Sequence, residues 1–323
     1  MFMKVPIKRK EDFPFRLIDK IESRIEDLTP ENINEILKEG VIVELNFMND
    51  AIDSMDKETL DLLQSRLNYV LKYQNLELKH FLEFDINSLQ QLSPKIVKSV
   101  LQNPDVVELL SDDCLKKLLT FSEEVAEFAI QQKHIGERLN QINTNPNQQT
   151  FPSSCAARAI LLMMYHTDHI NEKECTPLKE FEIYKSIWTT PGGVADPAKL
   201  MSFLENNKLN VISIVLEDRA AQTLKNAEGK DPGLVAAYGM FKNRSKNLQS
   251  IPNSEKYVFP NNSTALVMVS SKDMPGGHLV FCRSNDDGEI TVVDPSSGEA
   301  NTHKNFHDFM KNNDDLGVHF QFS

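Results

Sequence analysis

The chain has 323 residues, of which 40% are hydrophobic and 25% charged, and its formal net charge at pH 7 is -12. These values indicate a soluble globular protein with room for two domains. The acidic balance argues against nucleic acid and anionic membranes as partners, and no apolar run reaches the roughly 18 residues that a membrane span needs.

Residues 1–142 are predicted to form a helical domain that recognises a substrate or partner. The first residues, MFMKVPIKRKEDF, are basic but lead into no apolar core, so we expect no secretory signal peptide. A cap residue followed by proline, the usual start of a helix, occurs three times. Two serines precede paired acidic residues, which suit the positive end of a helix. These predicted helix starts are Thr29-Pro30, Ser93-Pro94, Asn103-Pro104, Ser111 and Ser122.

The polar segment 143–149, NTNPNQQ, is predicted to be a linker to a second domain that spans 143–323. An apolar helix is expected at 156–165, and segment 225–257 is interpreted as a surface insertion without a clear strand. Runs rich in β-branched residues predict strands. The predicted strands are 211–216, 265–270, 279–283, 289–293 and the C-terminal VHFQFS, which we prefer to read as a strand rather than a secretion tail.

Four widely spaced cysteines, none in a C-x-x-C pair, argue against structural zinc and a disulfide framework. We expect Cys114, Cys175 and Cys282 to be reduced and to behave as small buried hydrophobic residues. Cys155 differs because it begins the predicted apolar helix. The positive end of the helix dipole favours a nucleophilic thiolate there, and Ser153 or Ser154 is expected to cap the same helix.

Two further residues complete a candidate catalytic set with Cys155. His278 opens a predicted strand after Gly276 and Gly277, and an imidazole at such a position can act as general base towards a thiol. Asp294 ends the next strand, 16 residues later, across a hairpin that contains Asp-Gly. A loop centred on Asp286 places His278 and Asp294 directly opposite each other, where a carboxylate can orient the imidazole.

Together these residues resemble the papain-like cysteine peptidase superfamily, in particular its double-glycine leader peptidases and its bacterial effector proteases and deamidases. In that superfamily a glutamine six residues before the nucleophilic cysteine donates to the oxyanion, and Gln149 stands six residues before Cys155. A Gly-His pair before apolar residues supplies the base, as Gly277-His278 does here. Aspartate or asparagine before proline follows a hairpin, as in Asp294-Pro295. The resemblance covers about Gln148 to the C-terminus.

The resemblance implies an α+β papain-like fold, with a central helix packed on an antiparallel sheet, preceded by the all-α domain. It implies acyl transfer without a metal or organic cofactor: Cys155 attacks, His278 transfers protons and Asp294 orients His278. Gln149 would stabilise the oxyanion together with the backbone N–H of Cys155. Many relatives carry glycine where this chain has Ala156, so subsite preferences are not transferred.

Three functions are compatible with these residues. The first is a protease that acts on a protein substrate, such as a host protein reached by a bacterial effector. The second is a glutamine deamidase or transglutaminase-like acyl transferase, because the same scaffold supports both chemistries. The third is a non-enzymatic interaction protein with a relict triad.

His166 and His169, three residues apart, have no evident third metal ligand and are interpreted as solvated.

Overall fold

The computed structural model describes residues 94–322 except 103, 210, 229–234, 236–237, 240–246, 271–276 and 313–314. The chain divides into two compact units, Met1–Ile135 and Gly136–Ser323, and the division falls within helix α10 (Lys133–Ile142). The sequence predicts the boundary at the end of this helix, after residue 142. The helix start expected at Thr29-Pro30 lies outside the described residues.

The described part of the first unit consists of short helices that begin where the cap signals predicted. Helices α6 and α7 start at Pro94 and Pro104. The hydroxyl groups of Ser111 and Ser122 accept backbone N–H groups in the first turns of the next two helices. The helices are α6 (Pro94–Gln102), α7 (Pro104–Leu109), α8 (Asp112–Leu119) and α9 (Glu123–Ile130).

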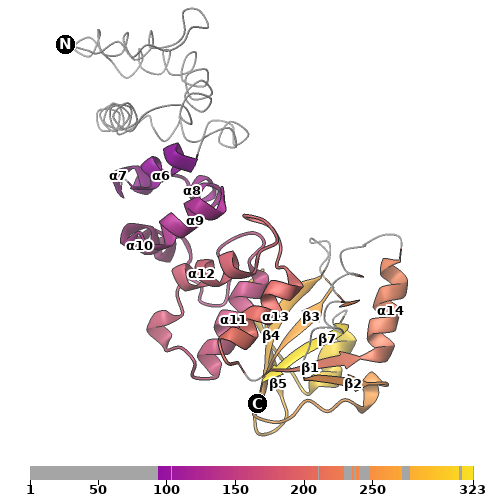
Figure 1. The fold of residues 1–323 in the computed structure, drawn as a ribbon. Helices are drawn as coiled ribbons and strands as arrows, with labels where there is room; N and C mark the ends of the chain where they lie inside the picture. Colours follow the sequence, from indigo (N-terminus) through magenta and orange to yellow (C-terminus); the bar gives the residue numbers. More distant parts are fainter. Residues whose placement is uncertain are drawn as a thin grey trace, which may run out of the picture. The chain divides into compact units, whose positions relative to one another are not determined.

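The second unit is an α+β structure built on a seven-stranded sheet (Figure 1). The strand order is β2-β1-β7-β3-β4-β5-β6, and the sheet is mixed because β1 and β2 run parallel while the other neighbours run antiparallel. The strands are β1 (Val211–Leu216), β2 (Leu248–Ile251), β3 (Thr264–Val269), β4 (His278–Ser284), β5 (Ile290–Val293), β6 (Ala300–His303) and β7 (Asp315–Phe322).

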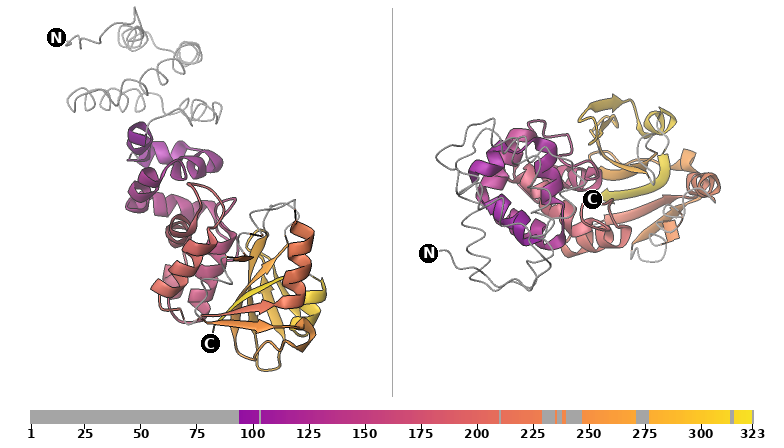
Figure 2. Two further views of the ribbon diagram at one scale, coloured as in Figure 1. Left: turned by 45° about the vertical axis from the view of Figure 1, so that its right-hand side comes forward. Right: turned by 90° about the horizontal axis from the view of Figure 1, so that it is seen from above.

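Helices lie on both sides of this sheet. Helix α11 packs on β3 and β4, with α12 and α13 beside it, whereas α14 packs on β7 from the other side (Figures 1 and 2). None of the helices in the described ranges is long and apolar enough to cross a bilayer. The α-helices of this unit are α11 (Cys155–His166), α12 (Pro177–Ile187), α13 (Pro197–Asn206), α14 (Glu217–Ala227) and α16 (Phe306–Asn312).

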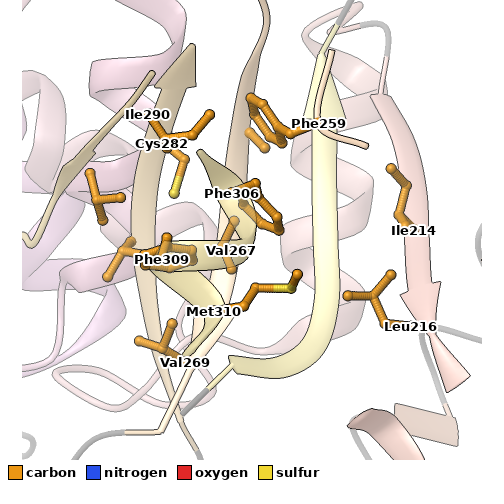
Figure 3. Close-up of a cluster of buried hydrophobic side chains, with 13 residues drawn as sticks. Ile214, Leu216, Phe259, Val267, Val269, Cys282, Ile290, Phe306, Phe309 and Met310 are labelled. Carbon is orange, nitrogen blue, oxygen red and sulfur yellow. The ribbon is translucent and has the colours of Figure 1, made fainter. Parts of the chain in front are cut away.

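A buried apolar cluster joins α16 to the sheet (Figure 3). Phe306, Phe309 and Met310 of α16 pack among strand residues such as Val267 and Cys282, all of which are almost inaccessible to solvent. Burial raises the pKa of the Cys282 thiol well above its usual range. Cys282 is therefore an unreactive hydrophobic core residue, as the sequence predicted.

Two sequence expectations about this unit change with the structure. Segment 225–257 is not merely a surface insertion, because it contains β2, which pairs in parallel with β1 at the sheet edge. The sheet is consequently mixed rather than purely antiparallel. The C-terminal residues do form a strand, as predicted, and β7 lies between β1 and β3 with every described side chain buried.

Strand β7 contains a buried contact between an aspartate and a histidine, beside a close backbone approach. Asp315 and His319 are both fully buried, with 2.9 Å between Asp315 Oδ2 and His319 Nε2. Asp315 Oδ1 also accepts the backbone N–H of Gly317 at 2.7 Å. Gly317 has φ of 79°, and a Cβ there would lie 2.8 Å from the backbone nitrogen of Ala220 and 2.9 Å from the carbonyl oxygen of Leu216. Only glycine fits this contact between β7 and α14.

We therefore expect Gly317→Ala to destabilise the protein by about 2–4 kcal/mol, through left-handed backbone strain and overpacking. Gly239→Ala is the matched control, because no described residue other than its neighbours in the chain lies within 4 Å of the Cβ position at Gly239. The measurement is urea unfolding of both variants beside the wild type. A Gly317→Ala variant as stable as Gly239→Ala would contradict the packing described here.

Candidate active site

Cys155 is the first residue of α11, so its sulfur stands at the positive end of a helix as predicted. The helix forms because its first ten residues are nearly all apolar, and all ten are buried. Cys155 itself is 9% exposed, so a small part of its surface remains open to solvent. The N–H groups of the first helical turn lie at this end of the helix, where they can stabilise a negative charge.

The predicted cap of α11 is wrong. Ser154 occupies the cap position, but its side chain makes no capping bond and instead donates to Glu180 Oε1 at 2.5 Å and lies 3.0 Å from the Phe151 carbonyl oxygen. Ser153 hydrogen-bonds with the Tyr184 hydroxyl. Among the described residues, the backbone N–H groups of residues 155–157 have no acceptor. These donors are therefore available to stabilise negative charge at the start of the helix.

His278 is the first residue of β4 and is 5% exposed. It follows Gly277, which has φ of 97° and where a Cβ would lie 2.8 Å from Leu316 Cδ1. Glycine is needed at this position because an L side chain would meet both backbone strain and a neighbouring side chain. Gly276, also singled out in the sequence, lies outside the described residues.

His278 and Asp294 interact, although the predicted register was wrong by two residues. Ser284 pairs with Ile290, so the hairpin loop is centred on Asp287, and continuing the pairing of β4 and β5 sets His278 opposite Ser296 rather than Asp294. A shift of two residues keeps the same face of the sheet, because side chains alternate with period two. Asp294 is thus a diagonal neighbour, and its Oδ1 lies 2.6 Å from His278 Nε2.

The carboxylate of Asp294 is held by the turn that follows β5. Its Oδ1 also accepts the backbone N–H of Ser296 at 2.8 Å. Burial raises the pKa of Asp294, but hydrogen bonds from His278 and from the N–H groups of Ser296 and Ser297 outweigh this effect and leave the pKa below its ordinary value. Asp294 is therefore ionised at neutral pH and can orient the imidazole.

The second ring nitrogen of His278 is left for Cys155. His278 Nδ1 is buried and has no hydrogen bond of regular geometry within the described ranges, yet the Cys155 thiol lies near enough to interact with the ring. Burial lowers the pKa of His278, but hydrogen bonds with Asp294 and Cys155 raise it to about 9. Since this value exceeds 7, the imidazole is protonated at neutral pH, which suits a thiolate–imidazolium pair.

Gln149 lies in the loop before Cys155, but its amide is engaged locally. Its Nε2 donates to the carbonyl oxygens of Phe151 at 3.0 Å and Pro152 at 2.8 Å, and its Oε1 is buried without a partner among the described residues. Both N–H bonds of the amide are thus in use. A role in binding an oxyanion requires the amide to share or exchange one of these bonds.

The segment predicted to be a linker is instead part of the site. The backbone N–H of Gln149 donates to the Pro295 carbonyl oxygen at 2.7 Å, and Gln148 Nε2 donates to the Ser296 carbonyl oxygen at 3.3 Å. Asn143 Nδ2 closes the segment on itself by donating to the carbonyl oxygen of Gln148 at 2.7 Å. These bonds tie the loop before Cys155 to the turn after Asp294.

Several residues near the site were not identified from the sequence. The Ser296 hydroxyl lies 3.5 Å from His278 Nε2. The buried pair of Arg158 and Glu180, 2.5 Å apart, lies beside the loop before Cys155. Arg158 did carry a signal, because it is the one charged residue in the apolar run CAARAILLMM and a buried charge needs a partner.

His166 and His169, which the sequence analysis considered as metal ligands, each contact a neighbouring side chain. His166 is stacked on Phe281, with 5.1 Å between ring centroids, and His169 contacts Thr167 at 2.8 Å. Burial, and then the nearby Arg283 charge, lower the pKa of His166. In the part of the chain that the structure describes, no group of three or more His, Cys, Asp or Glu side chains is arranged to hold a metal ion.

Comparison with known proteins gives no relative: no family model, curated protein or solved structure matches the chain. The resemblance to papain-like peptidases therefore rests on the residues described above.

The contact between Cys155 and His278 can be tested through the pKa of His278. We expect a value of about 9 in the wild type, and a lower value in both Asp294→Asn and Cys155→Ala, because each variant removes an interaction that favours imidazolium. NMR titration of the imidazole protons measures it. An unchanged pKa in Cys155→Ala would show that the thiol and the ring do not interact.

Proposed function

We propose that the protein is a cysteine hydrolase of papain-like fold that cleaves amide bonds in a protein substrate, with Cys155, His278 and Asp294 as its catalytic triad. The observation that carries the proposal is that Asp294 binds Nε2 of His278 while the Cys155 thiol lies near enough to interact with the same ring. Asp294 directly follows β5, His278 begins β4 and Cys155 begins α11, so long-range folding brings these residues together. A structural role alone gives no reason for a partly open thiol at the end of such a chain.

The arrangement of elements supports the papain-like assignment. The nucleophile begins a long apolar helix, α11, which packs on β3 and β4. The base opens β4, and the orienting carboxylate follows β5 across a hairpin. This is the order and placement that the sequence resemblance implies for its catalytic residues.

In the acylation step, the Cys155 thiolate attacks the carbonyl carbon of the scissile amide and the carbonyl π electrons move to oxygen. The backbone N–H of Cys155 stabilises this oxyanion, because no acceptor in the described structure competes for it. The His278 imidazolium then protonates the leaving nitrogen as the C–N bond breaks, which leaves a thioester and a neutral imidazole.

In the deacylation step, neutral His278 removes a proton from water as the water oxygen attacks the thioester. The second oxyanion collapses, the C–S bond breaks, and thiolate and imidazolium are restored. Asp294 keeps Nε2 of His278 directed to itself throughout, so Nδ1 is the nitrogen that exchanges protons at the reaction centre.

The function is tested by offering a proteome to the wild type and to Cys155→Ala, and reading the products by mass spectrometry. We expect new peptide termini with the wild type and none with Cys155→Ala, whose melting temperature should remain close to that of the wild type. A gain of about one dalton at glutamine without cleavage would instead identify the deamidase chemistry that the same triad supports.

Thiol labelling separates an active enzyme from an interaction protein with a relict triad. Iodoacetamide should label Cys155 at neutral pH well before Cys175, because burial raises the pKa of Cys175. Quantitative peptide mass spectrometry measures both rates in one sample. Labelling of Cys155 no faster than Cys175, together with identical products in the proteome test, would favour the relict triad.

The role of Gln149 gives a separate prediction. If its amide donates to the oxyanion, Gln149→Ala should lower kcat by about 100-fold with little change in KM, the loss seen when one oxyanion donor is removed. Ser297→Ala, an exposed change in the turn after Asp294, is the control. A loss of kcat below about threefold would restrict Gln149 to the local contacts seen here.

A further inference from the structure

A fully buried carboxylate lies next to the catalytic cysteine and takes no part in the proposed chemistry. Glu180, on α12, is 0% exposed, and its ion pair with Arg158 of α11 is buried on both sides. Removing a charge from water costs several kcal/mol unless partners compensate for it. The compensation here comes from the loop that leads to Cys155.

Glu180 accepts four hydrogen bonds. Its Oε1 accepts the backbone N–H of Thr150 at 2.8 Å and the Ser154 hydroxyl at 2.5 Å. Its Oε2 accepts the Thr150 hydroxyl at 2.6 Å and Arg158 Nη2 at 2.5 Å. Three of the four donors therefore belong to Thr150 and Ser154, which stand on either side of the bend that precedes Cys155.

The bond to Ser154 has a specific consequence for the start of α11. A serine at a helix cap normally accepts an N–H group of the first turn. Here the Ser154 hydroxyl donates a hydrogen bond to Glu180 instead. The backbone at Ser154 (φ of -97°, ψ of 19°) is also not in the extended conformation of a regular cap. The N–H groups of residues 155–157 consequently keep no side-chain acceptor within the described ranges.

His278 Nδ1 is buried and makes no regular hydrogen bond to any described residue, which is a second, independent sign that a reacting group belongs near this helix start. We propose that Glu180 is a positioning residue for Cys155: it fixes the loop 150–154 and holds Ser154 out of the capping position, so that the first-turn N–H groups of α11 serve the thiolate and the oxyanion. The inference rests on the proposed function.

The test compares Glu180→Gln with Glu182→Gln in the full chain. Glu182 lies two residues further along α12, in a partly exposed pair with Lys179 at 2.7 Å, so the same substitution there leaves the loop untouched. In Glu180→Gln an amide N–H₂ replaces one acceptor oxygen and the charge opposite Arg158 is lost. Alkylation of Cys155 by iodoacetamide, followed by peptide mass spectrometry from pH 5 to 10, gives the rate and the midpoint of thiolate formation.

We expect Glu180→Gln to slow alkylation of Cys155 at pH 7 by about 10- to 100-fold, the range that a small misplacement of a reacting group costs, and to move the midpoint to higher pH. Glu182→Gln should match the wild type. With a cleavable substrate in hand, the loss should fall on kcat rather than KM. An unchanged rate and midpoint in Glu180→Gln would overturn the proposal.

A second variant distinguishes positioning from charge balance and remains informative if Glu180→Gln unfolds. Glu180→Leu combined with Arg158→Met removes both buried charges, a replacement that proteins often accept without loss of stability. The proposal expects this folded double variant to remain slow at Cys155, because Ser154 and Thr150 have lost their bonds to Glu180 and Ser154 keeps only its local contacts with Phe151. Wild-type reactivity in it would mean that Glu180 only neutralises Arg158. Slow labelling of Cys155 in the wild type itself would instead count against the proposed enzyme.

Discussion

The described site depends on the hydrogen bonds and the ion pair that the buried carboxylate of Glu180 makes. This carboxylate brings one charge into the interior, and that charge has to be matched by four donors from α11 and from the loop before it. Stacked rings close the same region, with Phe151 and Phe181 4.8 Å apart. An uncompensated buried charge is costly, so the loop has little freedom to adopt another path. The position of Cys155 follows from that loss of freedom.

The opposite half of the site is fixed by β-structure rather than by charge. His278 and the turn after Asp294 are set by the pairing of β4 with β5 and by the five-residue loop between them. The two halves meet at the hydrogen bonds from the Gln149 backbone to the Pro295 carbonyl oxygen and from Gln148 Nε2 to the Ser296 carbonyl oxygen. Two bonds of ordinary strength do not hold such a junction alone. Its geometry relies on the helix–sheet packing of α11 on β3 and β4 beneath it.

Local signals in the sequence were sufficient for many elements and for the contact between His278 and Asp294. Apolar runs and cap residues predicted α11, β1 and β7, and the Asp-Gly turn predicted the β4–β5 hairpin. The register failed by two residues because loop length alone does not say which turn residues pair. Because side chains alternate with period two, a shift of two residues keeps Asp294 on the same face of the sheet, and its carboxylate still contacts His278. Strand β2 was missed because LQSI is short and polar, and only its parallel partner β1 makes it a strand.

The network around Glu180 was beyond such reasoning, because it joins residues 30 positions apart in sequence whose types are common in loops and helices. Serine before a helix predicts a cap, and here the rule fails at Ser154, next to the proposed nucleophile. Sequence rules are expected to fail where a local preference is given up for a function.

The second ion pair of the site, His278 with Asp294, differs from the first, Arg158 with Glu180, in its dependence on pH. The Arg158 charge is permanent, whereas the imidazolium of His278 is lost as the pH rises through about 9. The protonated ring stabilises the fold most fully below its ordinary pKa of 6.5, and this contribution disappears on the alkaline side. The site thus combines the buried pair of Arg158 and Glu180, which holds the loop, with the pair of His278 and Asp294, whose proton is available to the proposed reaction.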